Sequence, residues 1–316
     1  MSFIQKLIDS IRDKKSVVCM GLDPRMEQTG QIPQFIIDQN SNPNEIIKEF
    51  NKTLIENTYD LIPIIKPQIA FYEKYDALDA LKETIKYAHK KDLLVLLDSK
   101  RNDIGSTSKA YAEANYGIYG ADACTINAYF GIDGVKPFLD YKKRGTFILV
   151  KTSNPSSRDF QDLISTDLDP SLMKNRFFKE IKFNELKGID NRVTLKPNYI
   201  KMTELVQKWA KGLEKYEEYH NLGMVVGATF PEELKWIRKL VSESFILIPG
   251  YGAQGATAED IKFGFNKNGL GAIVNSSRGI MFAYNSNNNF TSERFAEAAR
   301  NEIQKMNKVI NNIIRL

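Results

Sequence analysis

Short apolar runs rich in valine, isoleucine and leucine recur along the chain, and stretches with helical periodicity generally separate them. Eight such runs occur, at 16–23, 61–67, 92–100, 123–127, 146–154, 224–229, 245–250 and 272–279. Apolar strands without polar alternation are typical of a parallel sheet that is covered on both faces. Eight strand-then-helix units predict a closed (β/α)8 barrel, the TIM-barrel architecture, and an open doubly wound sheet is the alternative.

Helices are predicted between these runs and at both ends of the chain, at 1–15, 44–58, 76–91, 108–117, 203–219, 231–241, 257–265 and 292–314. One region, about 159–201, breaks the alternation, because it is too long for a simple connection and mixes charges with aromatic residues. We expect an insertion there, after the fifth strand, with a helix of its own. No repeat or linker divides the chain, so residues 1–316 are expected to form a single domain.

Composition narrows the classes of function. The net charge is +5, but lysine and arginine are interleaved with 39 acidic residues, so a nucleic-acid partner, which would need a basic cluster, is not expected. No segment reaches the roughly 18 apolar residues of a membrane span. The only two cysteines, Cys19 and Cys124, lie in apolar runs, which favours buried thiols and a reducing compartment. We therefore expect a cytoplasmic protein without a membrane partner.

Polar residues end several of the predicted strands. Asp98 and Lys100 end the third strand, and their spacing of two would place both side chains on one side of an extended backbone. A strand that simply ends in solvated charges is the alternative. The other strands favour a site, because they end in Asp23, in Lys66, in 152–154 and in Arg278. In a barrel such groups converge on the C-terminal rim, where catalytic residues sit.

The ordered motifs GLDP, IIKPQ, DSKRNDIGST, VKTSNPSS, VVGAT, PGYGAQG and NSSRG resemble the orotidine 5′-monophosphate decarboxylases, specifically the longer branch with KPQIAFYE and TSNP motifs. The resemblance spans roughly 21–279. It implies a carboxy-lyase that converts orotidylate to uridylate and carbon dioxide in pyrimidine synthesis. It also implies a homodimer and a reaction that needs no metal or organic cofactor.

By the same resemblance, Lys66, Asp98, Lys100 and Asp103 form an alternating charged array, in which Lys100 protonates the product carbanion. Physical chemistry agrees with such an array, since neighbouring opposite charges keep aspartates ionised and lysines protonated. Asp103 and Thr107 would reach the neighbouring subunit's site.

The remaining implied roles concern substrate binding. Asp23, together with Lys66, matches the ribose ligands. Ser153 matches the position that reads the pyrimidine, with Thr152 as its close neighbour, and the assignment between these two stays open.

A phosphate site is implied by Gln254, Arg278 and the backbone around Gly279, next to a loop with Gly250, Gly252 and Gly255. A turn in which Thr257 caps the next helix with Asp260 is the simpler interpretation of that loop.

Three other functions remain open from the residues themselves. A Schiff-base aldolase would need a neutral Lys100, which the adjacent aspartates disfavour. A sugar-phosphate decarboxylase or synthase of the same superfamily would need a divalent metal. A phosphate-ligand binding protein without chemistry would be expected to show a break in the charged array, and the sequence shows none.

Overall fold

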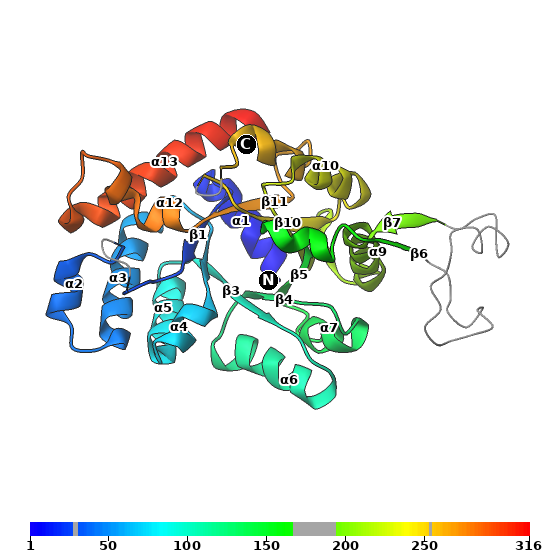
Figure 1. Ribbon diagram of the computed structural model, residues 1–316, viewed down its shortest axis with the longest axis horizontal. Coiled ribbons are helices and arrows are strands. Elements are labelled where there is room, and N and C mark those ends of the chain that lie inside the picture. Colours follow the sequence, from blue (N-terminus) through cyan, green and yellow to red (C-terminus); the bar gives the residue numbers. More distant parts are fainter. Residues whose placement is uncertain (28–30, 167–193, 253–254) are drawn as a thin grey trace.

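The computed structural model describes residues 1–27, 31–166, 194–252 and 255–316, and its centre is a closed barrel of eight parallel strands (Figure 1). The barrel order is β10-β11-β1-β2-β3-β4-β5-β9, and it closes because β9 also pairs with β10. The eight strands are β1 (Val18–Leu22), β2 (Ile64–Pro67), β3 (Leu94–Arg101), β4 (Ala123–Ile126), β5 (Gly145–Lys151), β9 (Tyr219–Val226), β10 (Ser244–Pro249) and β11 (Ala272–Ser276). The predicted TIM barrel is confirmed, and the open sheet is wrong.

Helices surround the barrel and connect successive strands. The α-helices are α1 (Phe3–Lys14), α2 (Gln34–Gln39), α3 (Pro43–Thr58), α4 (Ile69–Lys74), α5 (Leu78–Lys90), α6 (Gly105–Glu113), α7 (Ile132–Leu139), α9 (Asn198–Ala210), α10 (Pro231–Leu240), α11 (Ala258–Ile261), α12 (Arg278–Met281) and α13 (Phe295–Ile314). Shorter helical turns are η1 (Ala114–Ile118), η2 (Pro155–Asp159), η4 (Lys262–Gly264), η5 (Ala283–Ser286) and η6 (Ser292–Arg294). Of these described helices, none is both long and apolar enough to cross a membrane.

Helix α1 lies against the N-terminal ends of β5 and β9, where the Ile4 N–H donates to Asn221 Oδ1 at 2.9 Å. Its predicted apolar face is buried, namely Phe3, Ile4, Leu7, Ile8 and Ile11. The Phe3 ring packs edge-on against Phe147 at 6.0 Å, and a Cβ added to Gly145 would lie 2.4 Å from that ring. The close approach of Phe3 therefore requires glycine at the first residue of β5. The polar residues of the predicted site lie at the opposite, C-terminal end of the strands.

The predicted helix at 203–219 is wrong in its second half. Helix α9 ends at Ala210, and Gly212 adopts φ +84°, a backbone conformation that favours glycine. A two-residue strand, β8 (Lys215–Tyr216), then pairs antiparallel with the start of β9. The strand predicted at 224–229 therefore begins earlier, at Tyr219, and the helix predicted at 257–265 is likewise short, because α11 passes into η4.

The region after β5 carries a two-stranded ribbon. Strands β6 (Ile164–Thr166) and β7 (Leu195–Pro197) pair antiparallel, and Figure 1 shows them projecting away from the barrel. The ribbon is continuous with α9, which returns the chain to the barrel. Most of the expected insertion, 167–193, lies outside the described residues, and the helix expected within it is not tested there.

Candidate active site

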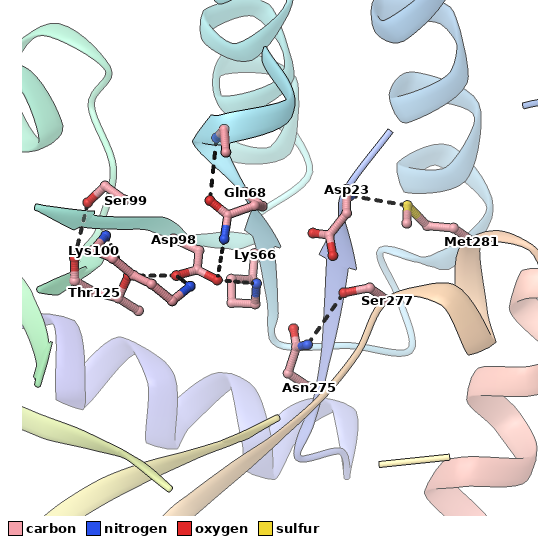
Figure 2. Close-up of polar contacts among 11 residues, drawn as sticks. Asp23, Lys66, Gln68, Asp98, Ser99, Lys100, Thr125, Asn275, Ser277 and Met281 are labelled. Carbon is pink, nitrogen blue, oxygen red and sulfur yellow. Dashed lines mark hydrogen bonds and ion pairs between the residues drawn. The ribbon is translucent and has the colours of Figure 1, made fainter. Parts of the chain in front are cut away.

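The C-terminal ends of β2, β3 and β4 place a chain of charged and polar groups at one rim of the barrel. Lys66 lies on β2, Asp98 and Lys100 lie on β3, and Thr125 lies on β4. Figure 2 shows the two lysines approaching the Asp98 carboxylate from different sides. Lys66 Nζ lies 2.8 Å from Asp98 Oδ2, and Lys100 Nζ lies 2.6 Å from Asp98 Oδ1.

Burial differs along this chain of charges. The side chains of Lys66 and Asp98 are only 5% and 8% exposed, whereas that of Lys100 is 43% exposed. Two ammonium groups thus share one buried carboxylate, and only the outer ammonium faces solvent. Of these three charged groups, Lys100 is the one that is available to a molecule bound at the rim.

The backbone at Lys100 departs from the extended conformation that the sequence argument assumed. Its φ is +48°, and the register between β3 and β4 shifts, with Leu97 opposite Cys124 but Arg101 opposite Ile126. Four residues of β3 therefore span the length of two residues of β4, as in a bulge that re-aims a side chain. The predicted meeting of Asp98 and Lys100 is confirmed, but an irregular strand end brings it about.

Two neutral side chains complete the surroundings of Asp98. Gln68 Nε2 donates to Asp98 Oδ2 at 3.0 Å, and the Thr125 hydroxyl donates to Asp98 Oδ1 at 2.7 Å. Neither residue was predicted from the sequence, because neither side chain is charged. A usable signal for Gln68 was its spacing of two from Lys66, whereas Thr125 is hidden inside an apolar run.

Charge pairing decides the protonation of the buried pair. Burial would raise the pKa of Asp98, but the charges of Lys66 and Lys100 outweigh it and hold that pKa well below its ordinary value. Burial likewise would lower the pKa of Lys66, but the carboxylates of Asp98 and Asp23 raise it overall.

The pair stabilises the fold over a wide pH range. The contribution of Asp98 is present above its unfolded pKa of about 3.9 and is lost as the pH falls through the folded value. That of Lys66 is present below its unfolded pKa of about 10.4 and is lost as the pH rises through the folded value.

Asp23, the residue directly after β1, and Asn275 on β11 lie at the same rim (Figure 2). The Asp23 backbone N–H donates to Met281 Sδ at 3.3 Å, and Asn275 Nδ2 donates to Ser277 Oγ at 3.5 Å. Within the described ranges, Asp23 Oδ1 and Asn275 Oδ1 are buried acceptors without a hydrogen-bond donor. Both are suited to accept hydrogen bonds from hydroxyl groups of a ligand.

The end of β5 holds Thr152 and Ser153 at the rim through contacts with the following loop. The Thr152 N–H donates to Gln161 Oε1 at 2.9 Å, and Gln161 Nε2 donates to Thr152 Oγ1 at 2.8 Å. Ser153 packs against Gly227, where an added Cβ would lie 2.8 Å from it. Its carbonyl accepts from Thr229 Oγ1 at 3.3 Å.

The structure describes most of the residues that were expected to bind a phosphate. Gly250, Gly252 and Gly255 all have positive φ, between +70° and +104°, as a tight glycine-rich turn requires. Thr257 is the N-cap of α11, with its N–H donating to Asp260 Oδ2 at 2.7 Å. Arg278, the first residue of α12, is exposed, and Gly279 follows it. Gln254 lies outside the described residues.

Asp103 and Thr107 stand apart from the array. Asp103 Oδ1 accepts the N–H of Ile104 at 2.7 Å, and Thr107 is exposed on α6. In the described part of this single chain, the ion pairs of the array link Lys66, Asp98 and Lys100 and do not include Asp103. Of the four charges predicted from the resemblance, three are thus joined by ion pairs in the described chain.

Known proteins resemble this chain over most of its length. The family described as orotidine 5′-phosphate decarboxylase / HUMPS matches residues 16–214. The orotidine 5′-phosphate decarboxylase of Petrotoga mobilis is 37% identical over 313 residues, which cover 97% of each chain. The chain belongs to this family.

Other members of the decarboxylase family agree over nearly the whole length. The Caldicellulosiruptor saccharolyticus orotidine 5′-phosphate decarboxylase is 36% identical over 307 residues, covering 90% of both chains. The structure of Leishmania donovani OMP decarboxylase superposes with a TM-score of 0.73 at 26% identity and covers both chains completely. The family resemblance inferred from the motifs is therefore confirmed.

Replacing Asp98 by asparagine tests the buried pair of this family member. Asp98→Asn leaves the Lys66 ammonium buried without its counter-charge, so we expect a loss of about 3–5 kcal/mol in the free energy of unfolding. Urea denaturation at neutral pH measures it. The matched control is Asp140→Asn, which breaks the exposed Lys136 pair and should cost about 1 kcal/mol or less. Equal small losses in both variants would contradict the buried-pair argument.

Proposed function

We propose that this chain is an orotidine 5′-phosphate decarboxylase, which converts orotidylate to uridylate and carbon dioxide in pyrimidine synthesis. The observation that carries the proposal is the buried carboxylate of Asp98 between the ammonium groups of Lys66 and Lys100, at the rim of a barrel of this family. The substrate and reaction come from the named relatives, and the array supplies the chemistry they need.

The reaction breaks the bond between the pyrimidine ring and its carboxylate. The electron pair stays on the ring carbon, and carbon dioxide leaves. Lys100 is suited to stabilise the resulting carbanion as an ammonium and then to give it a proton, which it recovers from solvent. Asp98, fixed by Lys66, would face the substrate carboxylate and favour its departure, since two like charges repel at short range. All these steps use the charges of the array alone.

The substrate is proposed to lie across the rim. Asp23 and Lys66 would bind the ribose hydroxyls, a role that the buried acceptor of Asp23 supports. Thr152 and Ser153 would read the pyrimidine edge. Arg278, Gly279 and Gln254 would bind the phosphate, and the exposed position of Arg278 supports its part in this.

We further propose a homodimer in which Asp103 and Thr107 complete the neighbouring subunit's site. The separation of Asp103 from its own array supports this arrangement. So do the exposed apolar side chains around it, since Ile104 is 54% exposed and Phe130, whose N–H donates to Asn102, is 52% exposed. Exposed large apolar groups in proximity are typical of an interface.

The whole chain, 1–316, is proposed to form a single decarboxylase domain in the cytoplasm. Its two cysteines, Cys19 and Cys124, are buried and free, as expected for a protein of a reducing compartment. Among the described residues, no group of three or more His, Cys, Asp or Glu side chains is placed to hold a metal ion.

Ultraviolet absorbance of orotidylate in the presence of a chelator tests the reaction directly. The native chain should consume orotidylate, and Lys100→Ala should lower kcat at least about 100-fold because it removes the proton donor. Lys136→Ala, which removes an exposed lysine of α7, is the control and should leave the rate unchanged. A folded native chain that leaves orotidylate intact would refute the proposal, and activity that needs an added divalent metal would favour the sugar-phosphate reaction.

Mixing two inactive variants tests the shared site. Lys100→Ala and Asp103→Ala should each be severely impaired alone. A hybrid dimer has one site with both native residues, so an equal mixture should regain about a quarter of native activity after random subunit exchange. Equal amounts are mixed under conditions of subunit exchange, and each variant exchanged with itself is the control. If the mixture stays as inactive as its components, Asp103 acts within its own subunit.

A further inference from the structure

Thr125 contacts both Asp98 and Lys100. Its hydroxyl donates to Asp98 Oδ1 at 2.7 Å and accepts the backbone N–H of Lys100 at 3.1 Å (Figure 2). The residue is completely buried on β4. A hydroxyl has one donor and can accept as well, so a single group here satisfies one atom of each residue.

Both contacts involve groups whose geometry is constrained, namely the Asp98 oxygen that binds Lys100 and the left-handed backbone of Lys100. Asp98 Oδ1, the oxygen that Thr125 contacts, is also the one bound by Lys100 Nζ. Lys100 itself has φ +48°, a conformation that costs a residue with a side chain about 1 kcal/mol or more unless its surroundings fix it. The hydrogen bond from the Lys100 N–H to Thr125 Oγ1 fixes the backbone amide of Lys100.

The bulge is supported from behind by a second set of hydrogen bonds. Ser99 Oγ donates to the Thr125 carbonyl at 3.1 Å, and Asn115 Nδ2 from η1 donates to Ser99 Oγ at 3.2 Å. Thr125 is thus bonded through both its side chain and its backbone. A displacement of β4 would be transmitted to both charged residues of β3.

We propose that Thr125 is a positioning residue that fixes the Asp98 carboxylate and the Lys100 backbone relative to each other. The proposal rests on the proposed decarboxylase function and adds a neutral residue to its machinery. Small displacements of reacting groups, of about 1 Å, can cost about 100-fold in rate, so the effect belongs to kcat.

The test compares Thr125→Val, which keeps the shape and removes the hydroxyl, with Thr125→Ser, which keeps the hydroxyl. We expect Thr125→Val to lower kcat about 10- to 100-fold with little change in KM, and Thr125→Ser to stay within about threefold of native. The control is Thr146→Val, a buried residue of β5 whose hydroxyl contacts Tyr116 and not the array. It should be destabilised to a similar degree with kcat unchanged.

A second readout does not depend on activity. The Lys100 amide should lose protection from hydrogen exchange in Thr125→Val and keep it in Thr125→Ser, because the acceptor is absent only in the first. Unchanged protection, or equal impairment of the valine and serine variants, would overturn the positioning role. An inactive native chain would instead overturn the proposed function and leave the exchange result to decide the geometry.

A different observation concerns Lys151, a completely buried lysine at the end of β5. Its ammonium lies 2.5 Å from Asp162 Oδ1 and 3.2 Å from Ser157 Oγ, and it stands 4.3 Å from the centre of the Phe230 ring. A buried ammonium is costly unless it is paired and hydrogen-bonded, so these contacts hold Asp162 firmly.

The loop after β5 contacts the end of that strand through two consecutive residues, Gln161 and Asp162. Asp162 binds Lys151, while Gln161 binds Thr152 through both its amide oxygen and its amide nitrogen. Asp162 lies two residues before β6, the first strand of the ribbon. The segment 161–162, which leads into the ribbon, is therefore attached to Lys151 and Thr152, the two residues that precede Ser153.

We infer that Asp162 and Gln161 position Thr152 and Ser153 to contact the pyrimidine. The segment just before the ribbon would then take part in substrate recognition. This inference rests on the proposed function. It assigns Lys151 to anchoring the loop through Asp162 and gives it no part in proton transfer.

Asp162→Asn and Gln161→Ala test this inference, with Asp159→Asn as an exposed control in the same loop. Each of the first two should raise KM for orotidylate about tenfold, the effect of a lost hydrogen bond of about 1.4 kcal/mol, with kcat within about threefold of native. Uridylate binding should weaken equally, and binding of ribose 5-phosphate, which lacks the base, should not change.

Binding of ribose 5-phosphate that weakens as much as binding of uridylate, or unchanged uridylate binding in the two folded variants, would overturn the inference. If Asp162→Asn does not fold, Gln161→Ala still decides, because it leaves no buried charge unpaired. A native chain that binds ribose 5-phosphate and uridylate but does not consume orotidylate would contradict the proposed function alone.

Discussion

The rest of the rim depends on one ion pair, between the buried Lys66 ammonium and the Asp98 carboxylate. Neither charge could be buried alone, because the cost of removing an isolated ion from water exceeds what packing returns. The pair fixes the carboxylate so that its second oxygen is available to Lys100 and Thr125. The outer ammonium is thereby held in one place while remaining accessible from solvent.

The sequence predicted the barrel and the rim because both follow from repeated local patterns. Apolar runs give strands, and charges at their ends converge when eight parallel strands close. Lys66, Asp98 and Lys100 could be found in this way. Asp103 was assigned to the array by resemblance alone, and in the described chain its carboxylate accepts the Ile104 N–H and takes no part in the ion pairs of the array.

Other features could not be predicted, for physical reasons that differ. Thr125 and Lys151 lie within or at the end of apolar runs, where a threonine or a lysine gives no sign of its partner until the strands are paired. The left-handed backbone of Lys100 depends on the register between β3 and β4, which spacing within one strand cannot reveal. The early start of β9 depends on its antiparallel contact with β8, a short strand without an apolar signal of its own.

The pairing of β6 with β7 affects how freely the length of the chain between these two strands can vary. Because the two strands pair, the chain leaves at Thr166 and returns at Leu195 with its ends already held together. Closing a loop between fixed ends costs only about 0.6 kcal/mol more for each doubling of its length. Insertions or deletions between the two strands are therefore nearly neutral for the barrel, so this position can diverge among homologues while the rim keeps its geometry.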